Sequence, residues 1–299
     1  MRRRRLIGSG LASATVLALP EWALAQQAGS IPAAEAMGGG LTLIRGAVNG
    51  LVYRSGDASV LVDVPAPEFA GAGELYGPDP ILINTNWRPE HTEANEALGR
   101  RGVSIIAHEN TRQWMGNDFT VRWESRRYLP RAPEALPNST FYTATRRELG
   151  DEAVDIGHVP MAHTDGDAYV FFRRANVLFA GDLLTVAGYP VLDYSTGGWI
   201  RGMIEATEHL LAIVDDDTLL VPALGDPQRP AALEAQLTLC READEAVGMA
   251  YTTARSLEEL LAMKPLEAYR AERGDPGLFI ELAYRGMWGH IRQLGLGIV

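Results

Sequence analysis

Residues 84–92 read Asn84-Thr85-Asn86-Trp87-Arg88-Pro89-Glu90-His91-Thr92. They follow the short apolar run 81–84, which is typical of a buried strand, and precede residues 93–101, whose composition favours a helix. Residues 103–107 form a second apolar run of the strand type. This order predicts a β-loop-α-β unit with the polar loop at the carboxyl end of its first strand. Ligand-binding and catalytic side chains gather at that edge of such sheets.

Three later segments also place polar residues next to apolar runs. They read Ala162-His163-Thr164-Asp165-Gly166-Asp167, Leu178-Phe179-Ala180-Gly181-Asp182 and Val221-Pro222-Ala223-Leu224-Gly225-Asp226. Zinc in proteins takes imidazole, thiolate or carboxylate ligands. His91, His163, Asp182 and Glu90 carry side chains of these types.

The rest of the chain alternates strand-type runs with helical segments. Strands are expected over residues 41–45, 51–54, 59–64, 139–144, 153–156, 168–172, 177–180 and 218–221. A helix is expected to begin near Gly198 and to present its apolar residues on one face. After Asp226 the pattern is helical, with a run over residues 231–250 and a capping box that begins at Ser256. The order is mixed α/β.

Together these segments resemble the metallo-β-lactamase superfamily, and within it a bacterial branch of exported or quinoprotein-associated hydrolases. Further motifs of the resemblance lie at residues 83–95, 105–111, 158–160, 188–190, 195–198 and 256–265. The resemblance runs from residue 41 to the C-terminus. It implies a four-layer αββα sandwich, an α/β fold (α+β by some schemes), with a metal site at one edge of the two sheets.

In that family, three histidines hold one zinc ion, an aspartate and two histidines hold a second, and another aspartate bridges them. The resemblance places Asn86, Arg88 and His163 at the first site, Glu90, His91 and Leu224 at the second, and Asp182 at the bridge. His91, His163 and Asp182 retain the family ligand, and Glu90 differs from it by one methylene. At the remaining three positions, the histidine ligand of the family is replaced by Asn86, Arg88 and Leu224.

The arginine at position 88 is the most consequential of these losses. A guanidinium group has five N–H donors, carries no lone pair for a metal and stays protonated. We expect Arg88 to pair with the carboxylates of Asp182 and Glu90, and so to replace the cation. At an effective dielectric near 20, each such pair gains about 4 kcal/mol at about 4 Å before desolvation.

Two functions follow from this interpretation. The first is a metal-depleted pseudoenzyme or small-molecule binding protein that holds no metal. The alternative is a mononuclear hydrolase of an ester, thioester, amide or lactone. Its single zinc ion would be held by Glu90, His91 and Asp182 with help from His163, and Asp182 or Glu90 would be the general base.

Structural roles stay open for the same residues. His163 and residues 165–167 can shape a turn, because Asp and Gly favour turns. Asp182 can anchor a strand end, and Trp87 can either pack in the core or line a pocket. Residues 193–198 lead into a helix N-terminus, which serves either as an ordinary cap or as an anion site.

Three further residues are expected to be structural. His108 and His158 stand beside apolar strands and are expected to have satisfied hydrogen bonds in the core. Cys240 is the only cysteine in the chain, so it forms no intrachain disulfide. It lies within the helical run 231–250 and is expected to be buried and inert.

The N-terminus has the composition of a targeting segment. Residues 1–25 combine a run of arginines, an apolar stretch and a small-residue cleavage signal, which predicts a signal peptide of the twin-arginine type. Residues 26–40 are expected to be a flexible lead, residues 41–226 the αββα domain, and residues 227–299 a helical C-terminal extension packed on it. The mature protein is then exported, either periplasmic or extracellular.

Charge limits the partners. Removing residues 1–25 takes away four arginines and Glu21, which moves the formal net charge from −11 to −14. So acidic a chain has no basic surface for nucleic acid and is repelled by anionic lipid headgroups. We expect a small-molecule ligand or substrate and neither a nucleic acid nor a membrane partner, and the sequence leaves the oligomeric state open.

Overall fold

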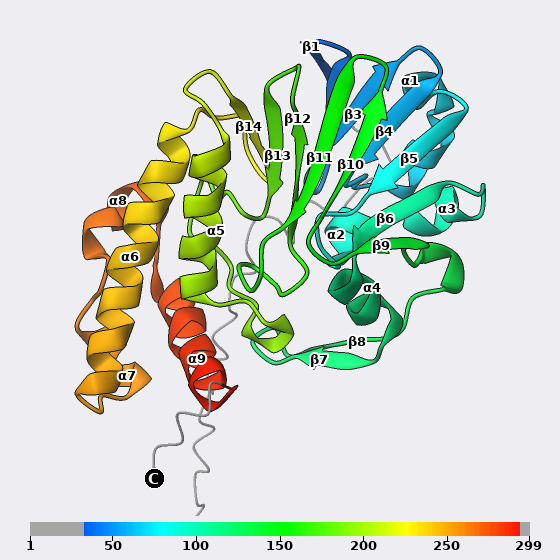
Figure 1. Cartoon of the computed structure of the whole chain (residues 1–299). Coiled ribbons are helices and arrows are strands. Elements are labelled where there is room, and N and C mark those ends of the chain that lie inside the picture. Colours follow the sequence, from blue (N-terminus) through cyan, green and yellow to red (C-terminus); the bar gives the residue numbers. More distant parts are fainter. Residues whose placement is uncertain (1–32, 294–299) are drawn as a thin grey trace, which may run out of the picture.

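Two β-sheets pack face to face in the computed structural model, which describes residues 33–293 (Figure 1). The first sheet has the strand order β1 (Ala33–Gly38), β2 (Leu41–Arg45), β3 (Asn49–Ser55), β4 (Ala58–Val62), β5 (Asp79–Ile83), β6 (Ser104–His108) and β9 (Ser139–Phe141). The second has the order β10 (Ala144–Leu149), β11 (Glu152–His158), β12 (Ala168–Phe172), β13 (Val177–Gly181) and β14 (Leu219–Pro222).

Apolar side chains from both sheets form the central core. Leu43, Leu51 and Val60 from the first sheet lie against Val170 and Phe172 from the second, and all five are almost fully buried. Alternation along each strand sends every second side chain into this layer. Because β4, β5, β6 and β9 run parallel, and β13 runs parallel to β14, their carboxyl ends meet at one edge of the sandwich.

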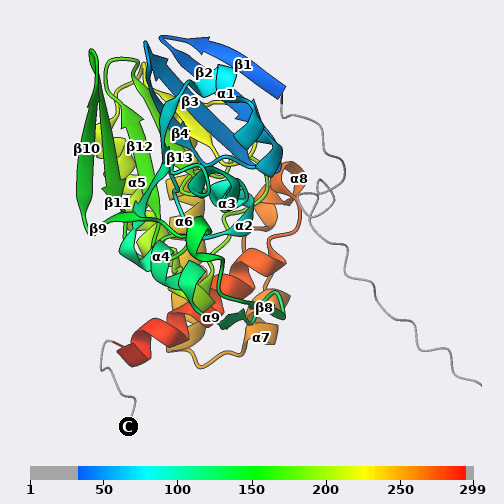
Figure 2. The same ribbon diagram turned by 90° about the vertical axis from the view of Figure 1, so that its right-hand side faces the viewer.

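Helices cover the outer face of each sheet (Figure 2). The shorter helices η2 (Pro67–Gly71), α1 (Gly73–Tyr76) and α3 (Asn95–Gly99) pack on the first sheet. The second sheet is covered by α5 (Ile200–Ile213), α6 (Ala231–Thr252) and α9 (Gly277–Gln293). The short elements α7 (Leu257–Ala262), η5 (Glu267–Tyr269) and α8 (Arg270–Arg273) connect α6 to α9. The expected four-layer αββα sandwich is confirmed.

The structure corrects the expected element boundaries in two places. Residues 33–38, expected to belong to a flexible lead, form β1, whose backbone pairs with β2. Residues 109–128, for which no element was expected, form α4 (Glu109–Gly116) and a hairpin of β7 (Phe119–Val121) and β8 (Arg126–Tyr128). The predicted signal peptide lies outside the described residues.

Two local predictions for the C-terminal part are confirmed. Ser256 caps α7 through the expected capping box with Glu259. Cys240 is buried in α6, and burial raises the pKa of its thiol to about 12, so the thiol stays protonated. Within the described residues, no helix is both long and apolar enough to cross a bilayer.

One glycine fixes how α5 sits on the sandwich. A Cβ atom added to Gly202 would lie 1.9 Å from the backbone oxygen of Met161. We therefore expect Gly202→Ala to lower the free energy of unfolding by at least about 2 kcal/mol, because backbone atoms must move to relieve the overlap. Urea denaturation followed by circular dichroism would measure this change.

The matched control is Gly248 in α6, where an added Cβ would meet no atom within 4 Å. Gly248→Ala should leave stability unchanged or raise it by up to about 1 kcal/mol, because alanine is the better helix former. Equal effects of the two substitutions would contradict the close approach at Gly202.

Candidate functional site

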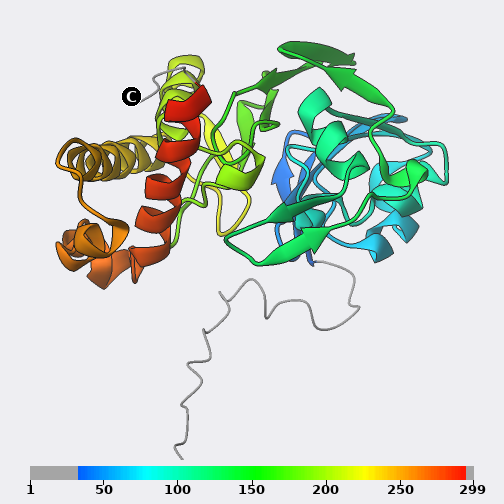
Figure 3. The ribbon, with the colours of Figure 1, turned by 90° about the horizontal axis from the view of Figure 1, so that it is seen from below.

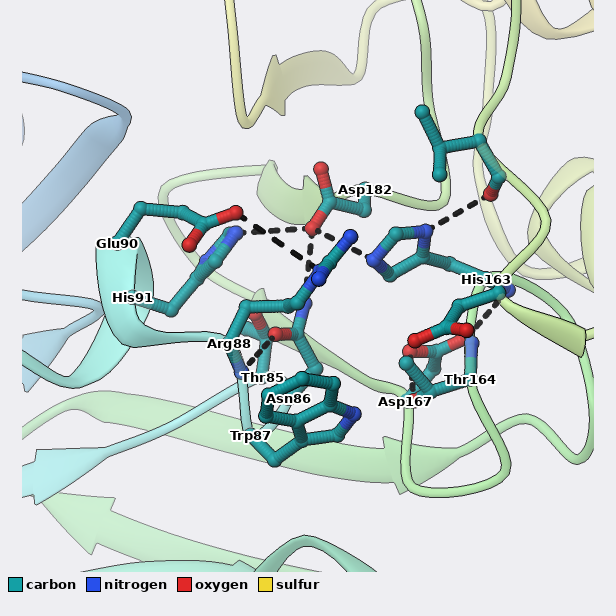
Figure 4. A network of polar contacts seen from close by, with 12 residues as sticks. Thr85, Asn86, Trp87, Arg88, Glu90, His91, His163, Thr164, Asp167 and Asp182 are labelled. Atoms are coloured by element: carbon teal, nitrogen blue, oxygen red, sulfur yellow. Dashed lines mark hydrogen bonds and ion pairs between the residues drawn. The ribbon is translucent and has the colours of Figure 1, made fainter. Parts of the chain in front are cut away.

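The loop after β5 and the loops that follow β4 and β13 meet at the carboxyl edge of the sandwich (Figure 4). Asn84 is buried and exchanges side-chain hydrogen bonds with Asn95, which fixes the loop at its start. Pro89 then begins the short helix α2 (Pro89–Thr92), which carries Glu90 and His91. A proline at the first helical position favours this turn because its φ angle is already helical.

His91 is held between two carboxylates. Its Nδ1 lies 2.8 Å from Oδ2 of Asp63, and its Nε2 lies 2.8 Å from Oδ2 of Asp182. Burial lowers the pKa of His91, but the charges of Asp182 and Asp63 outweigh it and hold that pKa well above its ordinary value. Because both neighbours are carboxylates, a doubly protonated imidazolium satisfies both contacts.

Asp182 is the centre of the retained cluster. Figure 4 shows its carboxylate between His91 on one side and His163 on the other. Its Oδ2 lies 3.6 Å from Nε2 of His163 and accepts a hydrogen bond from Nδ2 of Asn86 at 2.9 Å. Burial raises the pKa of Asp182, yet the adjacent histidines outweigh burial and hold that pKa well below its usual range.

Two neighbours orient the side chains around Asp182. Oδ1 of Asn86 accepts a hydrogen bond from the backbone N–H of Arg88 at 2.9 Å, so the amide turns its NH2 group toward Asp182. Nδ1 of His163 lies 2.8 Å from the carbonyl oxygen of Val191, which can only accept, so this nitrogen donates. These two contacts hold the side chains of Asn86 and His163 in fixed rotamers.

Arg88 is buried beside this cluster. Its Nη1 lies 2.6 Å from Oε1 of Glu124 and its Nε lies 3.8 Å from Oε1 of Glu90, while its side chain is 4% exposed. The guanidinium carbon lies 5.2 Å from the ring centroid of Trp87 and 5.4 Å from that of Trp123. Cation–π contacts of this kind strengthen when they are removed from water.

The expectation that Arg88 would neutralise Asp182 is wrong. The ion pairs of Arg88 go to Glu124 and Glu90, whereas the cationic partner of Asp182 at short range is His91. The reason is geometric, because Asn86 and the two histidines already surround the Asp182 oxygen that faces the cluster.

The β7–β8 hairpin supplies the missing counter-charge. Figure 1 labels this hairpin along the lower edge of the molecule, and Figure 3 shows it on the face seen from below. The turn between its strands carries Trp123, whose Nε1 donates to Oδ1 of Asp193 at 3.0 Å, and Glu124, which accepts from the Tyr128 hydroxyl at 2.6 Å. Trp87 packs edge-on against Tyr128 at 4.9 Å. Trp87 therefore packs under the hairpin.

The structure brings most, but not all, of the candidate residues together. His91, His163, Asp182 and Asn86 form one contact network, and Glu90 touches it only through Arg88. Leu224 is 48% exposed in the loop after β14. Asp63 and Glu124 were not among the predicted residues. A signal for Asp63 was present, because a lone aspartate ends the apolar run 59–62, but none marked Glu124.

These residues do not fit the dinuclear zinc site that the resemblance implies. Asn86 turns a donor group toward Asp182, Arg88 has no lone pair, and the Leu224 side chain is a hydrocarbon. Within residues 33–293, no group of three or more His, Cys, Asp or Glu side chains is arranged to hold a metal ion.

His108 and His158 lie at the margin of the site and stack on each other. Their ring centroids are 3.6 Å apart and nearly parallel, and each Nε2 donates to a backbone carbonyl, those of Tyr142 and Asp165 respectively. Burial, followed by the neighbouring His158, lowers the pKa of His108 to about 4. Nδ1 of His108 accepts the N–H of Asn110 and so caps α4. Both histidines have structural contacts, as the sequence predicts.

The buried ion pair between Glu124 and Arg88 should matter for stability. We expect Glu124→Gln to lower the free energy of unfolding by about 3 kcal/mol, because it leaves a buried guanidinium with only a distant partner. Urea denaturation would measure it. The control is Glu208→Gln, whose pair with Arg241 has the same 2.6 Å distance but is exposed to solvent. That change should cost less than about 1 kcal/mol, and equal losses would contradict the burial argument.

Acid should destabilise the protein through His108. In the unfolded chain this histidine takes up a proton near pH 6.5, whereas in the folded chain it does so only near pH 4. The unfolded state therefore binds more protons between these values, and stability falls as pH is lowered from 6.5 to 4. His108→Asn keeps an acceptor for the helix cap and should show a smaller loss over the same range. Identical pH profiles of unfolding would refute this assignment.

Comparison with known proteins gives a consistent family. A family model described as the metallo-beta-lactamase superfamily matches residues 93–246, which begin just after the loop 84–92 and include His163, Asp182 and Leu224. A comparison with curated protein sequences gives no match.

Solved structures support the same fold. The metallo-beta-lactamase from Pontibacter korlensis shares 16% identity over 70% of this chain and 99% of its own, with a TM-score of 0.57. The DIM-1 metallo-beta-lactamase shares 16% identity over 72% of this chain and 99% of its own, with a TM-score of 0.58. The sec-alkylsulfatase Pisa1 from Pseudomonas sp. shares 12% identity over 90% of this chain and 52% of its own, with a TM-score of 0.67. At these identities the likeness concerns the fold alone.

Proposed function

Because the chain belongs to the metallo-beta-lactamase superfamily, we propose that it is a member in which protein side chains have replaced the metal ions. It then acts as a metal-depleted pseudoenzyme that binds a small molecule and does not hydrolyse one. Its fold is that of hydrolases, but a fold does not carry a reaction without the groups that perform it.

The observation that carries this proposal is the burial of Arg88 at a former ligand position. Its side chain is 4% exposed and is paired with Glu124 at 2.6 Å. The guanidinium has no lone pair for a metal, and its charge is already balanced by Glu124. The position therefore offers a metal ion no ligand.

A second candidate function rests on a different observation. The Nε2 atoms of His91 and His163 are buried and face Oδ2 of Asp182 from either side, at 2.8 Å and 3.6 Å. Two imidazole nitrogens and a carboxylate are donors that a single zinc ion accepts. This candidate is a mononuclear hydrolase of an ester, thioester, amide or lactone, with Glu90 as a further ligand or, like Asp182, as the general base.

Two further aspects of the proposal concern the whole protein. The N-terminal segment of residues 1–25 supports export through the twin-arginine or general route, with the mature chain in the periplasm or outside the cell. Both sheets and α5 lie within residues 33–226, and the helices after residue 226 pack on α5. A small molecule is the proposed partner, since the acidic charge disfavours nucleic acid.

Metal analysis separates the two candidate functions. We expect protein folded with excess zinc and then freed of loose metal to contain close to no zinc by elemental analysis. A content close to one equivalent would favour the mononuclear enzyme and overturn the pseudoenzyme. In that case, His91→Ala and Asp182→Ala should each abolish hydrolysis of a panel of ester, thioester, amide and lactone substrates.

A reconstruction tests the assignment of the lost ligands. The combined variant Asn86→His, Arg88→His and Leu224→His restores imidazoles at the three positions, so its zinc content should rise well above that of the wild type. Protein folded in cobalt would give a second measure, because tetrahedral cobalt absorbs visible light. If neither metal binds to this variant, the positions are wrongly assigned.

A further inference from the structure

Four buried polar atoms near the loop 84–92 lie within 4 Å of an oppositely charged group but make no hydrogen bond of good geometry. They are Nε of Arg88, Oε1 of Glu124, Nε2 of His91 and Nε2 of His163. Buried polar groups in native proteins are nearly always paired, so such a concentration in one place requires an explanation.

The guanidinium of Arg88 is only partly used. Glu124 meets it at Nη1 alone, and the contact of Nε with Glu90 is a loose 3.8 Å. Elsewhere in the chain, Glu109 binds Arg112 through both Nε at 3.1 Å and Nη2 at 2.6 Å. Bidentate binding of this second kind is the stronger mode between arginine and a carboxylate. The Nε edge of Arg88 therefore has capacity for a second acceptor.

The carboxylate of Glu124 comes from the turn of the β7–β8 hairpin. Each strand of the hairpin has three residues, and a two-stranded ribbon of that size has little stability of its own. The hairpin is held at its turn by the bond from Trp123 to Asp193 and by the bond from the backbone N–H of Arg122 to Oγ of Ser195 at 3.1 Å. Its buried Val121 also packs with Trp87 and Met115. Local opening of such a segment costs less than global unfolding.

We propose that Glu124 is an internal substitute for a ligand carboxylate, and that a carboxylate-bearing small molecule takes its place on Arg88 when the hairpin lifts. Trp87 and Trp123 flank the guanidinium in the closed state, and Trp87 remains in place when the hairpin moves because it belongs to the loop after β5. This inference rests on the proposed function, because it requires a guanidinium where a metal would otherwise bind the ligand.

The central experiment removes the internal carboxylate and supplies one from outside. Glu124→Ala leaves a gap beside Arg88, so sodium acetate should raise the midpoint of thermal unfolding of this variant by several degrees over sodium chloride of equal concentration. The double variant Glu124→Ala, Arg88→Met should lose this difference. Glu208→Ala, which unpairs an exposed arginine, should show none.

The wild-type protein decides whether the site takes an external ligand. Benzoate should change tryptophan fluorescence saturably, with an affinity at least tenfold weaker than for Glu124→Ala because Glu124 competes. Hydrogen exchange of residues 119–128 should rise in its presence. If Glu124→Ala does not respond to acetate, or the double variant responds equally, the inference is overturned.

Two remaining outcomes are also decisive. If acetate stabilises Glu124→Ala while the wild type shows no saturable binding of benzoate, the inference is overturned, because Glu124 would then be a permanent counter-ion of Arg88. If Glu124→Ala does not fold, the same measurements are made on Glu124→Gln, together with the benzoate titration of the wild type. Absence of carboxylate binding in metal-free protein would refute this inference and leave the proposed function standing, whereas bound zinc would refute the proposed function itself.

Discussion

A buried guanidinium must be balanced by a carboxylate, and in this protein that requirement organises the edge of the sandwich. Arg88 lies in the loop after β5, Glu124 lies in the turn of the β7–β8 hairpin, and the two meet at 2.6 Å. Desolvating either charge alone would be costly, so neither residue is stable in its place without the other. The position of the hairpin is thus linked to the identity of one residue in the loop.

The retained cluster has a separate electrostatic balance. His91 lies between Asp63 and Asp182, and His163 is held by the carbonyl of Val191. These contacts fix the side chains of His91, His163 and Asp182 relative to one another. This network is separate from the ion pair between Arg88 and Glu124.

Much of the fold could be predicted from the sequence, and parts of the site could not. Strands such as β12 can be predicted because they are apolar throughout and bounded by polar turns. The loop 84–92 and Asp182 could be assigned to the site because the resemblance to the metallo-β-lactamase superfamily matches each of these positions to a metal ligand. Asp63 was missed, although it ends an apolar run, because a single aspartate at a strand end is an ordinary feature.

Glu124 could not have been found in the same way. The hairpin that carries it contains short, mixed strands with no alternation, and its position is set by contacts with Asp193, Trp87 and Arg88 that are distant in sequence. The wrong partner assigned to Arg88 has the same origin. The pairing of Arg88 with Asp182 was expected from the ligand positions of the family, whereas the close partner lies in an element that the family resemblance did not describe.

The coupling between loop and hairpin also limits which substitutions the chain tolerates. Replacing Arg88 alone by a neutral residue would leave the Glu124 carboxylate in the interior without its counter-ion, and replacing Glu124 alone would do the same to the guanidinium. Either single change therefore lowers stability until the second accompanies it. We expect the two positions to covary among related sequences.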